Sequence, residues 1–324
     1  MTQPRDRIAF VHASGYRGRF APSPTGRLHF GSLVAAVASY LDARAVGGQW
    51  LLRIEDLDPP REVPGAADLI IGQIEAYGFE WDGAVLYQRD RDARYVAALE
   101  HLARQGLTYP CSCSRQTLTD GVYPGTCAAG LIAGRRARAT RFRVGTGTGD
   151  LATLGFDDVI QGRVEQTLAT DIGDVVLKRA DGPYAYQLAV VVDDAEQGIT
   201  TVVRGADLLD STPRQIALQH ALGYGTPTYL HVPVATTANG EKLSKQTRAP
   251  SLDVRTPAAS LHDALVFLGQ PPPMPRQAAV LIELWAWAIA HWSRDQVPRQ
   301  RASRVAVDSA LAASRLNKHH GQRE

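Results

Sequence analysis

The segment Arg19-Phe-Ala-Pro-Ser-Pro-Thr-Gly-Arg-Leu-His-Phe-Gly-Ser32 runs from a short strand candidate at 19–21, through a turn rich in proline and glycine, into a long apolar helix. The first N–H groups of a helix lack partners within it and lie at the positive end of the helix dipole, so this start predicts an anion site. Gly26 allows a sharp turn, and Gly31 leaves room for a nucleotide against the backbone. An ordinary strand, turn and helix would share these turn residues, but His29 two residues before Gly31 favours the binding site.

The composition is typical of a folded chain with a sizeable core. Its 324 residues are 44% hydrophobic and 21% charged, which argues against disorder and allows two or three lobes. The net charge is +2, so any nucleic-acid surface has to be a local patch. We find no run of about 18 apolar residues and no secretory signal pattern. We therefore expect a cytoplasmic protein with no membrane partner, and a monomer.

Strands and helices alternate in the early chain. Residues 49–54 are predicted as a strand, and the apolar spacing over 65–77 and 92–105 predicts two helices. This alternation predicts an α/β fold with a parallel sheet that binds ligands at the carboxyl ends of its strands. Glu55 follows directly on the first of these segments. An isolated glutamate there is more often solvated, but it is also placed to face a pocket.

All three cysteines occur between residues 111 and 127, as Cys111, Cys113 and Cys127. A disulfide between residues two apart is disfavoured, and so is any disulfide in the cytosol. The cysteines are either buried thiols packing as small hydrophobic groups or ligands of one zinc ion. The spacing favours zinc, and either Tyr123 or a water molecule would complete the tetrahedron.

Five arginines follow the cysteines between residues 135 and 143. A charge run is usually a solvated face, but this patch is where RNA phosphates would be neutralised if the protein binds RNA. Glycines over 145–149 predict a flexible connection. Residues 156–164 and 173–178 are then predicted as short strands of an inserted lobe.

The parallel-sheet pattern resumes at residues 184–194, where an apolar segment ends in Asp193 and Asp194. This segment is either a buried helix or a buried strand whose end meets the pocket. Residues 201–204 predict a strand that delivers Arg204, and Pro213 suits a helix start. Near the end of the chain, residues 277–293 predict a helix whose tryptophans pack onto the core.

A second motif, Asn239-Gly-Glu-Lys-Leu-Ser-Lys245, lies over 200 residues after the first. The pair resembles the "HIGH" and "KMSKS" signatures of class I aminoacyl-tRNA synthetases, in the form found in glutamyl enzymes. The resemblance covers about residues 15–250. It implies a Rossmann-type catalytic domain that activates L-glutamate with ATP, accompanied by Mg²⁺.

The resemblance also implies roles for individual residues. His29 and Lys245 would be catalytic. The glutamate site would comprise Arg19, Ala21, Ser23, Glu55, Tyr186 and Arg204, with the two arginines clamping a carboxylate. The ATP site would comprise Pro22, Thr25, Gly26, His29, Gly31, Ser32, Lys242, Ser244 and Lys245. Short relatives of the glutamyl enzymes bind one structural zinc through residues matching Cys111, Cys113, Tyr123 and Cys127. The family often has asparagine where this chain has Val190, which puts one polar contact in doubt.

We expect five segments on this basis. Residues 1–14 form an N-terminal extension, 15–110 and 184–236 are the two halves of the catalytic domain, 111–183 are the zinc-bearing inserted lobe, and 237–324 are the signature loop and a helical C-terminal lobe.

The length after the second motif bears on which group of glutamyl enzymes the chain resembles. Only 79 residues (246–324) follow Lys245, whereas complete glutamyl enzymes continue through anticodon-binding domains. This resembles the shortened synthetases that transfer glutamate to the queuosine base in the anticodon loop of tRNA(Asp). Two alternatives remain: a short enzyme charging the 3′ end of tRNA(Glu), and a catalytically silent RNA-binding paralogue.

Overall fold

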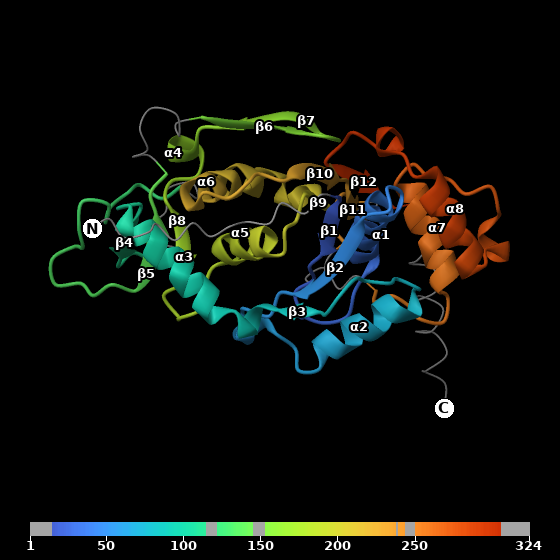
Figure 1. Ribbon diagram of the computed structural model, residues 1–324, viewed down its shortest axis with the longest axis horizontal. Coiled ribbons are helices and arrows are strands. Elements are labelled where there is room, and N and C mark those ends of the chain that lie inside the picture. The colour runs from blue at the N-terminus through green and yellow to red at the C-terminus, as the bar shows by residue number, and fades with distance from the viewer. Residues whose placement is uncertain (1–14, 115–121, 145–152, 238, 244–249, 306–324) are drawn as a thin grey trace, which may run out of the picture.

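The computed structural model describes residues 15–114, 122–144, 153–237, 239–243 and 250–305. Its centre is built from parallel strands. β1 (Arg17–Phe20), β2 (Gln49–Ile54) and β3 (Leu86–Tyr87) pair in that order, and β9 (Thr201–Gly205) pairs with β10 (Thr228–Val232). β1 packs beside β9, so both groups form one layer (Figure 1). The carboxyl ends of β1, β2 and β9 therefore meet, which confirms the predicted α/β fold.

Helices pack around this layer. The element that begins at the first signature is α1 (Phe30–Arg44), and the predictions over 65–77 and 92–105 correspond to α2 (Ala66–Ala76) and α3 (Asp92–Arg104). The segment 184–194 is a helix rather than a strand, α5 (Tyr186–Glu196), followed by α6 (Thr212–Leu222) with Pro213 in its first turn. Short 3-10 helices are η1 (Pro59–Arg61), η2 (Gln88–Asp90), η4 (Ala206–Ser211), η5 (Arg276–Ala278) and η6 (Arg294–Gln296).

An antiparallel region is inserted between the two parallel groups. β4 (Thr108–Cys111), β5 (Ala139–Phe142) and β8 (Val175–Lys178) form one sheet, with α4 (Leu168–Asp171) beside it, and β6 (Leu154–Asp158) and β7 (Gly162–Gln166) form a hairpin. The prediction of one strand over 156–164 is therefore wrong. The chain turns because the Asp158 carboxylate accepts the N–H groups of Ile160 and Gln161, and Gly162 adopts φ +79°.

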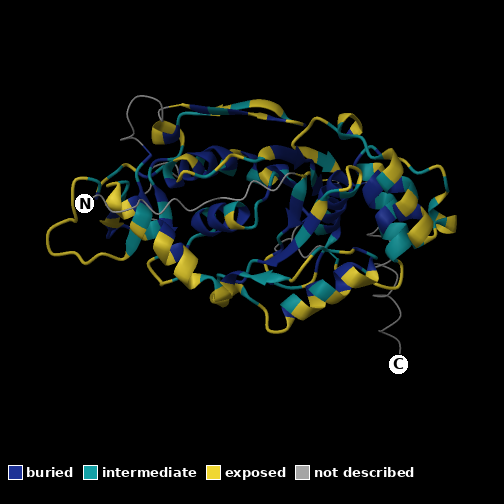
Figure 2. Ribbon diagram, in the orientation of Figure 1, coloured by how far each residue is buried: buried dark blue, intermediate teal, exposed yellow. Residues whose placement is uncertain are grey.

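The C-terminal region packs back on the first half of the chain. α7 (Pro257–Phe267) and α8 (Leu281–His291) lie against α1, and β12 (Ala302–Arg304) pairs with β11 (Val234–Thr236). The helix predicted over 277–293 is shorter than expected. Its tryptophan packing is confirmed at Trp285, whose ring centroid lies 4.9 Å from those of Tyr40 and Phe79. Buried residues fill the contacts between these elements, and exposed residues lie on their outer faces (Figure 2).

Among the described helices, none combines the length and the apolar character needed to cross a membrane.

Candidate active site

A cavity of about 620 Å³ opens at the carboxyl ends of β1, β2 and β9. Strand ends far apart in the sequence meet there, as expected for a parallel sheet. The residues predicted for substrate binding that line it are Arg19, Ala21, Ser23, Thr25, Glu55, Tyr186, Arg204 and Lys242. Sequence reasoning did not identify several other lining residues, which include Asp58, Arg61, Gln88, Arg179 and Asp207.

Arg19 is held at the cavity wall by an ion pair. Its side chain is buried, and its Nε and Nη2 donate to the two oxygens of Asp194 at 3.1 and 3.4 Å. Asp194 comes from α5, so this pair joins the two halves of the parallel layer. Burial alone would raise the pKa of Asp194, but the adjacent Arg19 and Arg53 hold it below its usual value.

Arg53 links the ion pair of Arg19 and Asp194 to Glu55. It is completely buried on β2, and its Nη1 lies 2.8 Å from Asp194 while its Nη2 donates to Glu55 at 3.3 Å. The Glu55 side chain is 8% exposed, so it is not the solvated carboxylate that an isolated strand exit would favour. Burial raises the pKa of Glu55, and the nearby arginines partly offset this effect. Sequence reasoning missed Arg53, although the strand pattern placed it two residues before Glu55.

Arg204 lies in a different electrostatic environment. Its Nε donates to His231 at 3.0 Å, its Nη2 to Thr212 and Gln215 at 3.0 and 2.8 Å, and its Nη1 to the Tyr186 hydroxyl at 3.4 Å. Among the residues that the structure describes, no carboxylate oxygen lies within 4 Å of this guanidinium. Arg204 is 6% exposed, so it is a buried cation with uncharged partners. Such a group favours an anionic ligand, since burying an unpaired charge is costly.

The first signature motif forms a loop next to the cavity. Gly26 has φ +128°, which favours glycine, and His29 caps α1 by accepting the Ser32 N–H on its Nδ1 at 3.3 Å. A Cβ added to Gly31 would lie 3.3 Å from the Leu243 carbonyl oxygen, and Leu252 donates its N–H to Leu28. The two signature regions therefore lie side by side. His29, Gly31, Gly26, Ser32 and Pro22 are not among the residues lining the cavity itself, although the Pro22 carbonyl accepts the N–H of Glu55.

The second signature is described only in part. Lys242 lines the cavity, and its Nζ lies 2.6 Å from the Asp207 carboxylate in η4. Ser244 and Lys245, which the sequence assigned to ATP, lie outside the described residues.

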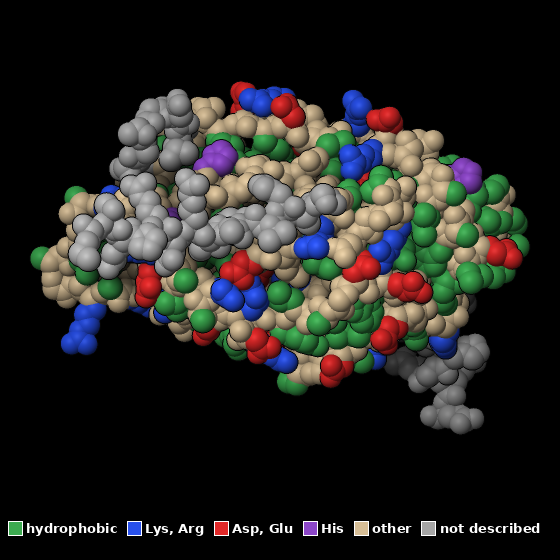
Figure 3. Space-filling view, in the orientation of Figure 1, with side chains coloured by type: hydrophobic (Ala, Val, Ile, Leu, Met, Phe, Trp, Pro, Cys, Tyr) green, Lys and Arg blue, Asp and Glu red, His purple; other side chains and the backbone are tan. Residues whose placement is uncertain are grey.

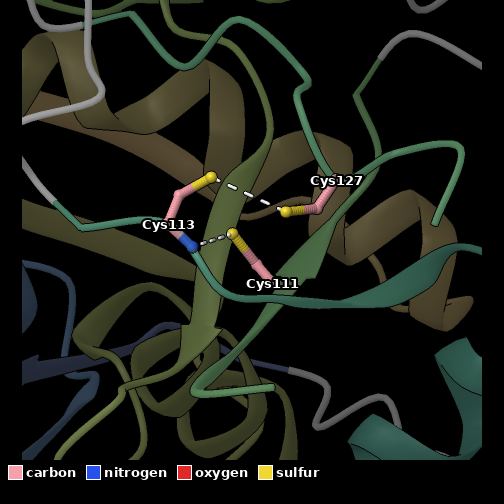
Figure 4. Close-up of side chains that lie close together, drawn as sticks. All are labelled: Cys111, Cys113 and Cys127. Carbon is pink, nitrogen blue, oxygen red and sulfur yellow. Dashed lines mark hydrogen bonds between the residues drawn. The ribbon is translucent and has the colours of Figure 1, made fainter. Parts of the chain in front are cut away.

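The three cysteines converge in a separate, buried cluster. Their Sγ atoms all lie within 4.8 Å of one another, and Figure 4 shows the side chains turned toward one another. The Tyr123 hydroxyl lies 3.4 Å from the sulfur of Cys111 and 3.7 Å from that of Cys113, and it accepts the Cys127 N–H at 2.9 Å. Burial would raise the pKa of Cys127, but hydrogen bonds from Ser112 and its neighbours lower it to about 6. The four side chains thus suit a metal that prefers thiolate ligands.

The five arginines of the predicted patch divide into two parts, so they do not form one solvated face. Arg135, Arg136 and Arg138 are exposed. Arg141 is buried, with its guanidinium 3.6 Å from the Tyr123 ring centroid and its Nε 3.3 Å from the Cys111 sulfur. Arg143 lies over the Tyr109 ring and donates to the Ala128 carbonyl. On the face shown in Figure 3, cationic and anionic side chains are interspersed.

The comparisons with known proteins agree with this geometry. The family model described as "tRNA synthetases class I (E and Q), catalytic domain" matches residues 16–122 and 137–259. A glutamate tRNA ligase from Elizabethkingia meningosepticum has a similar fold, with a TM-score of 0.73 at 24% identity, covering 95% of this chain and 70% of that one.

Closer relatives define the group within this class. A glutamyl-Q tRNA(Asp) synthetase of Dechloromonas aromatica is 59% identical over 297 residues, covering 89% of this chain and 97% of the relative. The protein of the same name from Pseudomonas aeruginosa strain PAO1 is 55% identical, covering 88% of this chain and 96% of its own. The chain belongs to this family of class I synthetases.

Proposed function

We propose that this protein is a ligase that activates L-glutamate with ATP in the absence of tRNA and then transfers the glutamyl group to the queuosine base of tRNA(Asp). The observation that carries the amino-acid assignment is the pair Arg19 and Arg204 in one cavity wall. Arg19 is paired with the carboxylate of Asp194, whereas the buried Arg204 has only uncharged hydrogen-bond partners among the described residues, so its positive charge is not balanced by a direct contact. This unbalanced positive charge suits an amino acid with an extra carboxylate, and the names of the relatives support that substrate.

The side-chain carboxylate of glutamate would lie between the two arginines, and the α-ammonium group would lie near Glu55. A guanidinium pairs with a carboxylate through charge-assisted bonds that a neutral amide does not reproduce. Glutamine in this site would leave Arg204 without an anionic partner. Binding alone therefore discriminates between the two amino acids by orders of magnitude.

Activation is a displacement at the α-phosphorus of ATP. An oxygen of the glutamate α-carboxylate forms a bond to this phosphorus, pyrophosphate leaves, and glutamyl-adenylate results. Such reactions depend on positioning and electrostatic stabilisation more than on general acid–base catalysis. We assign His29 and the start of α1 to the phosphates on one side, with Lys242 and the Ser244–Lys245 segment on the other. Mg²⁺ would be bound with ATP and neutralise phosphate charge.

In the transfer step, a hydroxyl of queuosine attacks the activated carbonyl. The new ester bond forms as the bond to AMP breaks, and the hydroxyl proton is released. The exposed Arg135, Arg136 and Arg138 are our candidates for RNA phosphate contacts. For the domain organisation, we propose that residues 15–110 and 184–236 form the catalytic domain and that residues 111–183 form the inserted lobe.

We further propose one structural zinc at Cys111, Cys113, Tyr123 and Cys127. A Zn–S bond of about 2.3 Å implies sulfur atoms about 3.8 Å apart in a tetrahedron. The distance between the sulfurs of Cys113 and Cys127 is 3.6 Å, and the two contacts of the tyrosine oxygen are similar. The zinc would crosslink β4 to the loop that carries Tyr123 and Cys127.

Two assays test the function. Glutamate-dependent exchange of pyrophosphate into ATP, without tRNA, tests activation, and its absence would favour a silent paralogue. Labelled glutamate is then offered to queuosine-containing tRNA(Asp) and to tRNA(Glu). Periodate cleaves the cis-diol of queuosine and also that of the 3′-terminal ribose, so the discriminating control is tRNA(Asp) that lacks queuosine but keeps an intact 3′ end, which should accept no glutamate. Charging of tRNA(Glu) instead would identify an ordinary glutamyl enzyme.

A further inference from the structure

The uncharged partners of Arg204 lead to a second pair of buried groups. His231, on β10 directly beside Arg204 in the strand register, is 0% exposed. Its Nε2 accepts the Nε–H of Arg204 at 3.0 Å, and its Nδ1 lies 2.6 Å from Asp158 Oδ2. Asp158 ends β6, the first strand of the hairpin that packs along β10. Asp158, His231 and Arg204 thus form a buried hydrogen-bonded chain that ends at the cavity.

The directions of these hydrogen bonds fix the protonation state of the His231 imidazole. The Nε–H of arginine only donates, so His231 Nε2 has to accept and carries no proton. The imidazole is therefore neutral, with its proton on Nδ1 and donated to Asp158. Burial, together with repulsion from Arg204, lowers the pKa of His231 to about 4 despite the opposing effect of Asp158. Geometry and burial agree on one tautomer.

Asp158 is itself held in one orientation by the backbone. Its Oδ1 accepts the N–H groups of Ile160, Gln161 and His231 at 3.0, 2.8 and 3.2 Å. Its Oδ2 is then the atom that faces the imidazole. The hairpin turn that sequence reasoning predicted as continuous strand is therefore also the structure that orients this carboxylate.

Because a neutral imidazole intervenes, Arg204 gains an orienting partner without gaining a direct counter-ion. Arg19, by contrast, contacts Asp194 directly. A carboxylate in direct contact with Arg204 would compete with an acidic ligand for the same guanidinium, whereas the imidazole leaves that charge to the ligand.

We propose that Asp158 and His231 are positioning residues that orient Arg204 toward the carboxylate of the bound amino acid and thereby set its affinity. This inference rests on the proposed glutamate site. The two residues act through Arg204 and do not line the cavity.

Asp158→Asn is the decisive variant. The asparagine oxygen would have to accept the hydrogen bonds of the three backbone N–H groups. The side-chain NH₂ would then be turned toward His231. The imidazole proton would then move to Nε2 and face the Nε–H of Arg204, donor against donor. We expect the KM for glutamate to rise roughly 10- to 100-fold, as for loss of one charge-assisted contact. The KM for ATP, and kcat at saturating glutamate, should change less than about three-fold.

The matched control is Asp157→Asn, one residue earlier on the same strand. The Asp157 side chain is 79% exposed, and its one ion pair among the described residues is with the exposed Arg163. The KM of this variant for glutamate should therefore match that of the wild type. Nitrogen-15 NMR of the histidines reports the tautomer directly, with the His231 signal assigned by its loss in His231→Gln. If the tautomer changes in Asp158→Asn while the KM for glutamate does not, the proposal is wrong.

A second pair of variants covers the case in which Asp158→Asn does not fold. In His231→Gln the amide oxygen still accepts from Arg204, so the KM for glutamate should stay within about five-fold, whereas His231→Leu should raise it at least ten-fold. Equal KM values for these two variants would overturn the proposal. Failure of the glutamate assignment is a separate result: the wild type would show no glutamate-dependent exchange, although the NMR tautomer would still be measurable.

Discussion

The cavity at the ends of the parallel strands and the cysteine cluster both gather polar groups in a buried place, but the residues of the cavity lie much farther apart in the sequence. The cluster draws its four side chains from residues 111–127. The cavity pairs Arg19 with Asp194 and Arg204 with His231, through elements that only the completed fold brings together. A locally built site tolerates changes elsewhere in the chain, whereas the cavity depends on the alignment of several strands.

The two regions also differ in how they balance charge. In the cavity, Arg204 is a buried cation with uncharged partners. In the cluster, the side chains are thiols and a phenol, and Arg141 stacks on Tyr123 and contacts Cys111. The first arrangement suits an anionic ligand that binds and leaves. The second suits a permanently bound cation, since thiolate charge is then shared between the metal and Arg141.

The largest effect should come from Arg204→Gln. Removing this charge should lower kcat/KM for glutamate by roughly 100- to 1,000-fold in pyrophosphate exchange, the usual effect of deleting one partner of a buried charged contact. Arg163→Gln, an exposed arginine on the β7 strand, is the control and should be unaffected. A loss smaller than three-fold would show that Arg204 does not bind the substrate.

Arg141→Gln should act on the other region. Outer-shell partners of metal ligands typically change metal affinity by about 10- to 100-fold. We expect a loss of that size when zinc is titrated against a chromogenic chelator, with Arg135→Gln, which alters an exposed arginine, as the control. Equal zinc affinity in both variants would show that Arg141 only packs against Tyr123.

Removal of the metal should distinguish the two regions. Treatment with a chelator should lower the melting temperature by a few degrees, because the ion would stabilise the inserted lobe. The KM for glutamate should change less than about three-fold, since the described cavity lining does not include the cysteines. Loss of glutamate activation on chelation, with the fold intact by circular dichroism, would contradict this independence.

The smallest effect concerns pH. The folded-state pKa of His231 is lowered to about 4, so the unfolded chain binds more protons between pH 6.5 and 4. Stability should therefore fall as pH drops through this window and be unchanged by this group above it. The groups acting on His231 are Asp158, Arg204 and Arg19. Denaturant unfolding of wild type and His231→Gln measures the difference, and the variant should lose less stability on acidification; parallel pH curves would contradict the prediction.

What sequence reasoning could predict follows from the same comparison. The cysteine cluster was found from spacing alone, and the strand ends carrying Arg19, Glu55 and Arg204 followed from alternation and the signature motifs. Asp158 and His231 were missed because neither belongs to a motif. Their meeting depends on a hairpin turn that apolar spacing predicted as one strand. The separation of Arg141 from Arg135 was missed because a charge run does not show which side chain turns inward.

The most direct measurement is an experimental structure with L-glutamate and a non-hydrolysable ATP analogue bound. We predict that the side-chain carboxylate lies within about 3 Å of guanidinium nitrogens of both Arg19 and Arg204, the range of charge-assisted hydrogen bonds. The α-carboxylate should face the α-phosphorus beside His29. A glutamate whose side-chain carboxylate contacts neither arginine would contradict the account.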